Sequence, residues 1–122
     1  MQVVAYDPYV RPESAGPDVR LLDLDAVFAA ADAISVHLPL TTETSRIVGR
    51  KQLGRLRAGA VLVNTSRGGV IDEDALVECL ESGRLAGAGL DVLASEPAAL
   101  PNSRRLLALD NVVCTPHMAI WY

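Results

Sequence analysis

The sequence is poor in aromatic residues, cysteine, histidine and lysine. Its 122 residues include one Trp, three Tyr, one Phe, two Cys and two His, and ten of the eleven basic residues are arginine. The basic residues form no run, and the formal net charge is −4. Nucleic-acid-binding proteins usually carry a cluster of positive charge, so we expect no nucleic-acid partner.

Long apolar stretches are also missing. The longest strictly apolar run, Ala26 to Ala31, is far too short to span a bilayer, and the N-terminus lacks the basic and apolar regions of a signal peptide. Cys79 and Cys114 form no CxxC pair and lie in apolar segments, which is typical of buried free thiols in a reducing compartment. We therefore expect a cytoplasmic protein with no membrane partner and no metal site.

Half of the residues are hydrophobic, and alanine, valine and leucine predominate. Short apolar runs predict strands over Val3–Tyr6, Ala33–Val36, Ala60–Asn64, Gly87–Val92 and Asn111–Thr115. Helices are predicted over Leu24–Asp32, Arg46–Leu56 and Asp72–Ser82, the first capped by Asp23 and the last stopped by Gly83. Pro97 to Asp110 is read as a loop. This alternation predicts an α/β fold with a parallel sheet and helices on both faces.

Almost every predicted strand ends in a polar or ionisable residue. These residues are Asp7, His37, Thr65 to Gly69, Asp91 with Glu96 nearby, and His117. The ligand crevice of an open parallel sheet lies at the carboxyl ends of its strands. The sequence therefore predicts a binding or catalytic site at this edge.

Asp7 ends the first predicted strand. An acid at this point of a dinucleotide-binding fold can bind the adenosine ribose hydroxyls, which favours NAD over NADP. The alternative is a turn-forming aspartate before Pro8. The glycine fingerprint GxGxxG that usually precedes such an acid by about twenty residues does not precede Asp7. The chain is therefore either not a dinucleotide binder or lacks the front of the fold.

The stretch LVNTSRGGVID places Arg67 at a strand end, before Gly68 and Gly69. A guanidinium there can clamp a carboxylate through two parallel hydrogen bonds or polarise a carbonyl. The glycines would let the backbone turn sharply or pass close to a ligand. The alternative is a surface arginine beside a flexible turn.

Glu96 and His117 form a second candidate pair. A carboxylate bonded to an imidazole fixes its tautomer and makes it a better-placed acid or base. The alternatives are a loop acid before Pro97 and a histidine at a helix entry. His37 either shapes a ligand pocket or only packs, and Trp121 either lines a substrate pocket or caps an interface.

These segments resemble the NAD-binding domain of the D-isomer-specific 2-hydroxyacid dehydrogenases, with a Rossmann-like fold. The matching motifs are VVAYDPYV, ADAISVHLPLTTET, GAVLVNTSRGGVIDEDAL, GRLAGAGLDVLASEP and LDNVVCTPH. They occur in the order and spacing of the family and cover most of the chain. The ending TPHMAIWY is most similar to the branch containing the C-terminal-binding-protein corepressors.

The resemblance implies a role for each matching residue. Arg67 would bind the carboxylate and carbonyl of a 2-keto acid, and His117, paired with Glu96, would exchange the proton while hydride passes to or from NAD. Trp121 would reach the substrate pocket. The implied cofactor-binding residues are Asp7, Leu38, Pro39, Thr44, Thr65, Ser66, Arg67, Asp91 and His117.

The resemblance also implies an incomplete domain. We expect residues 1–122 to lack the family's first strand, its GxGxxG turn and first helix, and the separate substrate domain. Such a chain would bind NAD weakly or not at all and would not turn over by itself, whereas the full-length subunit would form a homodimer. Two other hypotheses remain open: a non-catalytic NAD-sensing or corepressor-like protein-binding module, and a remnant that does not fold.

Overall fold

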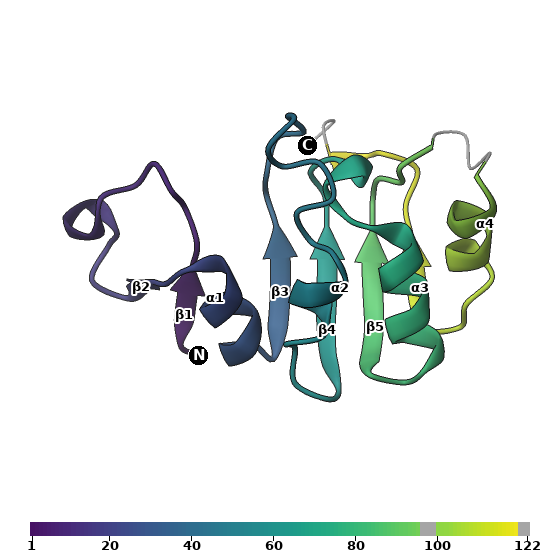
Figure 1. Cartoon of the computed structure of the whole chain (residues 1–122), viewed down its shortest axis with the longest axis horizontal. Coiled ribbons are helices and arrows are strands. Elements are labelled where there is room, and N and C mark those ends of the chain that lie inside the picture. Colours follow the sequence, from purple (N-terminus) through teal and green to yellow (C-terminus); the bar gives the residue numbers. More distant parts are fainter. Residues whose placement is uncertain (96–99, 120–122) are drawn as a thin grey trace.

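The computed structural model describes residues 1–95 and 100–119. Within these ranges the strands form two parallel sheets (Figure 1). The larger sheet has the order β3-β4-β5-β6, and its strands are Ala33–Val36, Ala60–Asn64, Leu85–Leu90 and Val112–Cys114. The smaller sheet pairs β1 (Val3–Ala5) with β2 (Val19–Leu21). The predicted Rossmann-like parallel arrangement is confirmed.

The helices are short. The α-helices are α1 (Leu24–Ala30), α2 (Arg50–Leu53), α3 (Glu73–Glu81) and α4 (Pro101–Leu107), and the 3-10 helices are η1 (Pro12–Ser14) and η2 (Gly68–Val70). No helix in the described part of the chain is long and apolar enough to cross a membrane.

Local sequence explains where two of these helices begin and end. The Asp23 side chain accepts a hydrogen bond of 2.8 Å from the Ala26 amide and caps α1, as predicted. Asp72 caps α3 in the same way through the Ala75 amide, at 3.3 Å. Gly83 follows α3 with a φ of 71°, a left-handed conformation that suits glycine, and stops the helix.

The helices α2, α3 and α4 lie in one layer on one face of the larger sheet, and α1 packs beside α2 and contacts β1. Neighbouring helices contact each other in the order α1, α2, α3, α4, and α2 and α3 lie in front of the strands in Figure 1. Along β4 the residues alternate between buried and exposed: Leu62 is fully buried, whereas Val61 and Val63 are each 39% exposed. Val113 of β6 is 70% exposed. The second face, predicted to carry helices as well, is therefore open in the part of the chain that the structure describes.

Charged side chains join successive helices across the outside of this layer. The ion pairs are Lys51–Asp25 between α2 and α1, Arg50–Glu78 between α2 and α3, and Arg105–Glu81 between α4 and α3. The Lys51 hydrogen bond lowers the pKa of Asp25, and the Arg50 hydrogen bond lowers that of Glu78. The pairs are solvent-exposed, so they orient the helices more than they stabilise them.

The structure corrects three sequence-based predictions. β2 lies where a loop was predicted, because three residues of mixed polarity give too short a pattern to indicate a strand. α4 lies inside the predicted Pro97–Asp110 loop, with Pro101 at its first turn and Leu106 in the core.

The third correction concerns the helix predicted over Arg46–Leu56, which is limited to α2. Of the residues before α2, Arg46 has a left-handed φ of 53°, and Val48 forms a parallel β-bridge with Ile71. Val48 donates to the Val70 carbonyl at 3.1 Å and accepts from the Asp72 amide at 3.0 Å. This pairing with the stretch before α3 replaces the first turns of the predicted helix.

Both cysteines are free, as predicted, and partly rather than fully buried against the core. Burial raises the pKa of the Cys79 thiol and of the Cys114 thiol. Raised pKa values disfavour the thiolate, which is the reactive form, and both side chains pack against the core.

The open face predicts a contrast between two adjacent residues of β4. Leu62→Ala should lower the free energy of unfolding by about 2–5 kcal/mol, because it removes a fully buried side chain. Val61→Ala, on the open face, should cost less than about 1 kcal/mol. Equilibrium urea unfolding of the two variants checks this, and equal losses would mean that both faces are covered.

Candidate functional site

Segments that follow the strands of the larger sheet gather along its carboxyl edge, at the top of Figure 1. Backbone hydrogen bonds continue beyond the strands and join these segments. The Asp91 amide donates to the Asn64 carbonyl at 2.9 Å, and the His117 amide donates to the Asp91 carbonyl at 3.0 Å. The segments that carry Arg67, Asp91 and His117 therefore follow three neighbouring strands, as the sequence predicts.

A buried amide shapes the turn that carries Arg67. The Asn64 side chain is fully buried at the end of β4. Its Oδ1 accepts from the Ser66 amide at 3.0 Å and from the Ser66 hydroxyl at 2.8 Å, and its Nδ2 donates to the Arg67 carbonyl at 3.1 Å. Thr65 and Arg67 are exposed. The turn is thus fixed from the inside, while these two side chains face solvent.

Gly68 is required by a close approach within the chain. A Cβ on this residue would lie 2.0 Å from the carbonyl carbon and oxygen of Leu93 and 2.4 Å from the Ala94 nitrogen. A Cβ on Gly69 would meet the side chain of Leu40 at 2.9 Å, and neither glycine has a positive φ. Gly68 therefore has a role that the sequence did not predict, because it lets this turn pack on the segment after β5, and the approach of the two glycines to a ligand stays a prediction.

Glu73, the first residue of α3, is a buried carboxylate that the sequence analysis did not single out. Its Oε1 accepts from the Ala94 amide at 2.8 Å and its Oε2 accepts from the buried Ser103 hydroxyl at 2.6 Å. It thereby ties α3 to α4 and to the segment that packs on Gly68. The helix dipole alone favours an acid in the first turn of a helix, so nothing in the sequence indicated that Glu73 also accepts hydrogen bonds from distant residues.

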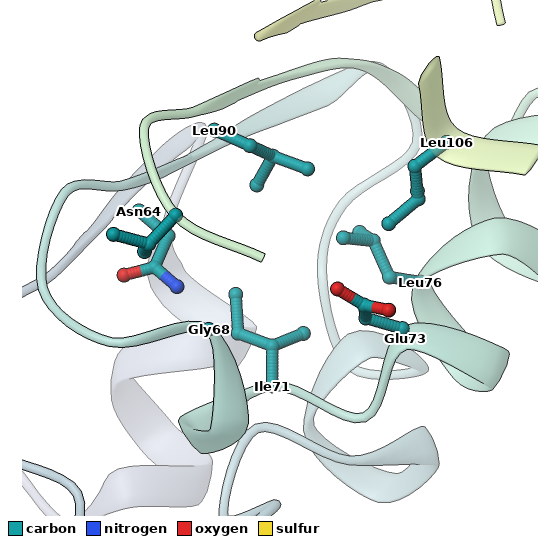
Figure 2. Close-up of a pocket in the computed structure, with 8 residues that line it drawn as sticks. Asn64, Gly68, Ile71, Glu73, Leu76, Leu90 and Leu106 are labelled. Atoms are coloured by element: carbon teal, nitrogen blue, oxygen red, sulfur yellow. The ribbon is translucent and has the colours of Figure 1, made fainter. Parts of the chain in front are cut away.

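The interior between the Arg67 turn and α4 is closely packed. Figure 2 shows Asn64 and Gly68 on one side of this interior and Glu73 with Leu106 on the other. The residues that line it leave no space for a water molecule. This interior is a support for the site and not a ligand cavity.

The Asp91 carboxylate anchors the segment after β6. It accepts hydrogen bonds from the Thr115 hydroxyl, from the Met118 amide at 2.9 Å and from the Ala119 amide at 2.8 Å. The Thr115 hydroxyl, followed by these amides, lowers the pKa of the carboxyl. Asp91 thus holds the segment that contains His117, and its contact with a cofactor stays a prediction.

His117 adopts a left-handed backbone conformation, with φ 54°. Non-glycine residues seldom take this conformation, and they do so where the surrounding structure holds them. Here the His117 amide donates to the carbonyls of Asp91 and Thr115, both at 3.0 Å. Glu96 and Trp121 lie outside the described residues, so the Glu96–His117 pair and the pocket role of Trp121 also stay predictions.

An open depression lies between the ends of β3 and β4. It has a volume of about 680 Å³ and is lined by His37, Leu38, Pro39, Leu40, Ser66 and Arg67. Four of the predicted cofactor-binding residues therefore meet in one place. The depression lies at the carboxyl edge of the sheet, where open parallel sheets typically bind their ligands.

Three side chains around this edge are held by local bonds. The Thr44 hydroxyl donates to the Pro39 carbonyl, which fixes the loop beside the depression. The His37 ring nitrogen Nε2 lies 2.8 Å from the Ser35 hydroxyl. Asp7 follows β1 in the smaller sheet, and its Oδ1 accepts from the Tyr9 amide at 2.9 Å, which is the turn considered as the alternative for this residue. Asp7 does not line the depression.

Comparison with known proteins extends these observations. Residues 1–119 match the family described as D-isomer specific 2-hydroxyacid dehydrogenase, NAD binding domain. The chain is 48% identical over 118 residues to hydroxypyruvate reductase of Thermotoga maritima, covering 97% of this chain and 38% of that protein. It is 46% identical over 120 residues to D-3-phosphoglycerate dehydrogenase of Archaeoglobus fulgidus, covering 98% and 22%.

Solved structures give the same result. A D-isomer specific 2-hydroxyacid dehydrogenase from Lactobacillus delbrueckii ssp. bulgaricus, in its NAD complexed form, superposes with a TM-score of 0.89 at 36% identity, covering 99% of this chain and 40% of that one. D-lactate dehydrogenase from Aquifex aeolicus, complexed with NAD and lactic acid, gives 0.90 at 32% identity, covering 100% and 40%. The chain thus spans less than half the length of each of these proteins.

The packing of Gly68 gives a testable prediction. Gly68→Ala should lower the free energy of unfolding by about 1–3 kcal/mol, because its Cβ would meet backbone atoms that cannot swing aside. Gly16→Ala is the matched control. Its Cβ would have no neighbour within 4 Å, so a gain of about 0.4–1 kcal/mol is expected. Urea midpoints that do not separate the two variants would contradict this packing.

Proposed function

The chain belongs to the D-isomer specific 2-hydroxyacid dehydrogenases as their NAD-binding domain, and from this premise we propose that it serves hydride transfer between NAD(H) and carbon 2 of a small 2-hydroxy or 2-keto acid. One observation carries the proposal. The exposed guanidinium of Arg67 and the half-buried His117 follow β4 and β6, the two strands that flank β5. The segments that carry a guanidinium and an imidazole thus follow strands of one sheet at the same edge, and we assign these groups to carboxylate binding and acid/base chemistry.

The residues present fit a bound dinucleotide. Leu38 and Pro39 supply apolar surface to the depression, and Ser66 supplies a hydroxyl. Thr44, Thr65 and Asp91 are proposed as further contacts, with Asp7 at the adenosine ribose. When bound, the nicotinamide supplies hydride to the substrate carbon or accepts it from there.

Residues of this chain carry out the remaining steps, which are substrate binding and proton transfer. Arg67 binds the substrate carboxylate through two parallel hydrogen bonds, which orients the carbonyl. His117 donates a proton to the carbonyl oxygen during reduction and takes it back during oxidation. Glu96 would keep the imidazole in the required tautomer, and Trp121 would border the substrate.

The activity is proposed for a longer assembly, because this chain spans 38% of the Thermotoga maritima protein and 22% of the Archaeoglobus fulgidus protein. We place residues 1–122 within one NAD-binding domain, with the GxGxxG turn and the substrate domain supplied by other residues. Pairing of such subunits into a homodimer stays a prediction.

The similarity to the corepressor branch rests on the ending TPHMAIWY. Residues 120–122 of that ending lie outside the described residues. The relatives named above are a reductase and dehydrogenases. We therefore favour the catalytic function over a non-catalytic NAD-sensing or protein-binding module.

The test uses a hybrid subunit, in which this chain replaces the matching 118-residue segment of the Thermotoga maritima hydroxypyruvate reductase. His117→Ala should lower kcat for hydroxypyruvate, glyoxylate or pyruvate by about 10²–10⁴-fold, with NADH affinity nearly unchanged. Arg67→Ala should raise KM for the keto acid by about tenfold or more, because a charged hydrogen-bonding partner is lost.

Arg57→Ala is the matched arginine control, because Arg57 pairs with Asp32 at the opposite end of the strands. It should leave both constants near those of the unmodified hybrid. Near-normal turnover by the His117→Ala variant would refute the acid/base role. A folded hybrid that binds NADH but reduces none of these keto acids would refute the proposal as a whole.

A further inference from the structure

The Asn64 side chain supports a role in the site that the sequence did not reveal. We propose that Asn64 is a positioning residue, which holds the Arg67 guanidinium in the place where it binds the substrate carboxylate. This inference rests on the proposed function of Arg67.

All three bonds go to the turn that directly follows Asn64. Its Oδ1 accepts the amide and the hydroxyl of Ser66, and its Nδ2 donates to the Arg67 carbonyl. An amide oxygen has two lone pairs, so both of them are used within two residues of chain. The side chain therefore fixes the backbone on both sides of the peptide that leads into Arg67.

The Arg67 side chain is coupled to this backbone. Its Nη1 donates to the Ser66 carbonyl at 2.7 Å. A guanidinium carries five N–H donors, so this bond leaves enough for a carboxylate clamp. Because Asn64 sets the position of Ser66, it also sets the anchor point of the guanidinium.

Because the Asn64 side chain is buried, few other residues could replace its hydrogen bonds. It is 0% exposed, so its removal would leave the Ser66 amide and the Arg67 carbonyl without their buried partner. An aspartate would keep an acceptor for Ser66 but, when ionised, would place a carboxylate oxygen against the Arg67 carbonyl, where Nδ2 now donates. Only a side chain with both a donor and an acceptor can bond to the Ser66 amide and to the Arg67 carbonyl.

The Asn64 backbone connects the turn to the other half of the site. Its carbonyl accepts from the Asp91 amide at 2.9 Å, and the Asp91 carbonyl accepts from the His117 amide at 3.0 Å. Asn64 therefore lies where the Arg67 turn meets the strand that positions His117. A disturbance confined to its side chain should affect the Arg67 turn first.

The first experiment measures the turn directly in the 122-residue chain by NMR. In Asn64→Ala, the Ser66 amide should exchange with solvent about tenfold faster or more, and the Nε–Hε group of Arg67 should become more mobile. Amides within β3 and β5 should keep their exchange rates. Asn111→Ala is the matched control, because Asn111 makes one side-chain bond, to the Leu80 carbonyl, just before β6.

The second experiment measures kinetics in the hybrid subunit. Asn64→Ala should raise KM for hydroxypyruvate about tenfold and KM for NADH by no more than about threefold, because Arg67 binds the keto acid directly, whereas Ser66 is one of several proposed cofactor contacts. Asn64→Asp should also raise the keto-acid KM, and it serves as the second variant if Asn64→Ala does not fold. Asn111→Ala should change neither constant. A general structural defect would instead raise both KM values by similar factors.

The outcomes separate this inference from the proposed function. If Arg67→Ala has no effect on keto-acid binding, the proposed function fails. If Arg67→Ala impairs that binding but the folded Asn64 variants leave it normal, or leave Ser66 exchange unchanged, only the positioning role of Asn64 is refuted. A selective rise of the keto-acid KM with faster Ser66 exchange supports it.

Discussion

The parallel pairing of β4 with β5 is the constraint on which the candidate site depends. It places Asn64 opposite Leu90 and so brings the Asp91 amide to the Asn64 carbonyl. The Arg67 turn directly follows Asn64, and the Asp91 carboxylate anchors the segment that contains His117. A slip of one residue would reverse the faces of β4, so that Leu62 became exposed and Val61 and Val63 buried. The chemistry of the edge thus follows from the register of one strand pair.

The carboxyl edge is held in place by α3 and by the segment after β5, as well as by the residues of the Arg67 turn. Glu73 joins α3 to the segment after β5, and Gly68 allows that segment to pack on the Arg67 turn. The ion pairs on the outer surface align the helices, whereas the second face of the larger sheet stays open in the described ranges. The larger sheet is thus covered by helices on one face, and its other face is open in the part of the chain that the structure describes.

Sequence patterns predicted the strands and the edge well, because β3 and β4 are short apolar runs followed by polar residues. The cap at Asp23 and the stop at Gly83 are local signals that need no tertiary contact, whereas Asp72, predicted as the first residue of its helix, is the cap of α3. α4 and β2 were missed because both depend on packing rather than on pattern. Asn64 and Glu73 were missed for a related reason: their partners are distant amides or a turn geometry that a single sequence does not display.

Arg67 and His117 are proposed to act on the same substrate. A crystal structure of the hybrid subunit with NADH and oxamate, an unreactive analogue of a 2-keto acid, would show whether they do. We expect two guanidinium N–H groups of Arg67 about 2.7–3.2 Å from the oxamate carboxylate oxygens. We also expect a ring nitrogen of His117 within hydrogen-bonding distance of the carbonyl oxygen. Oxamate bound in the presence of NADH but out of reach of both side chains would refute their shared role.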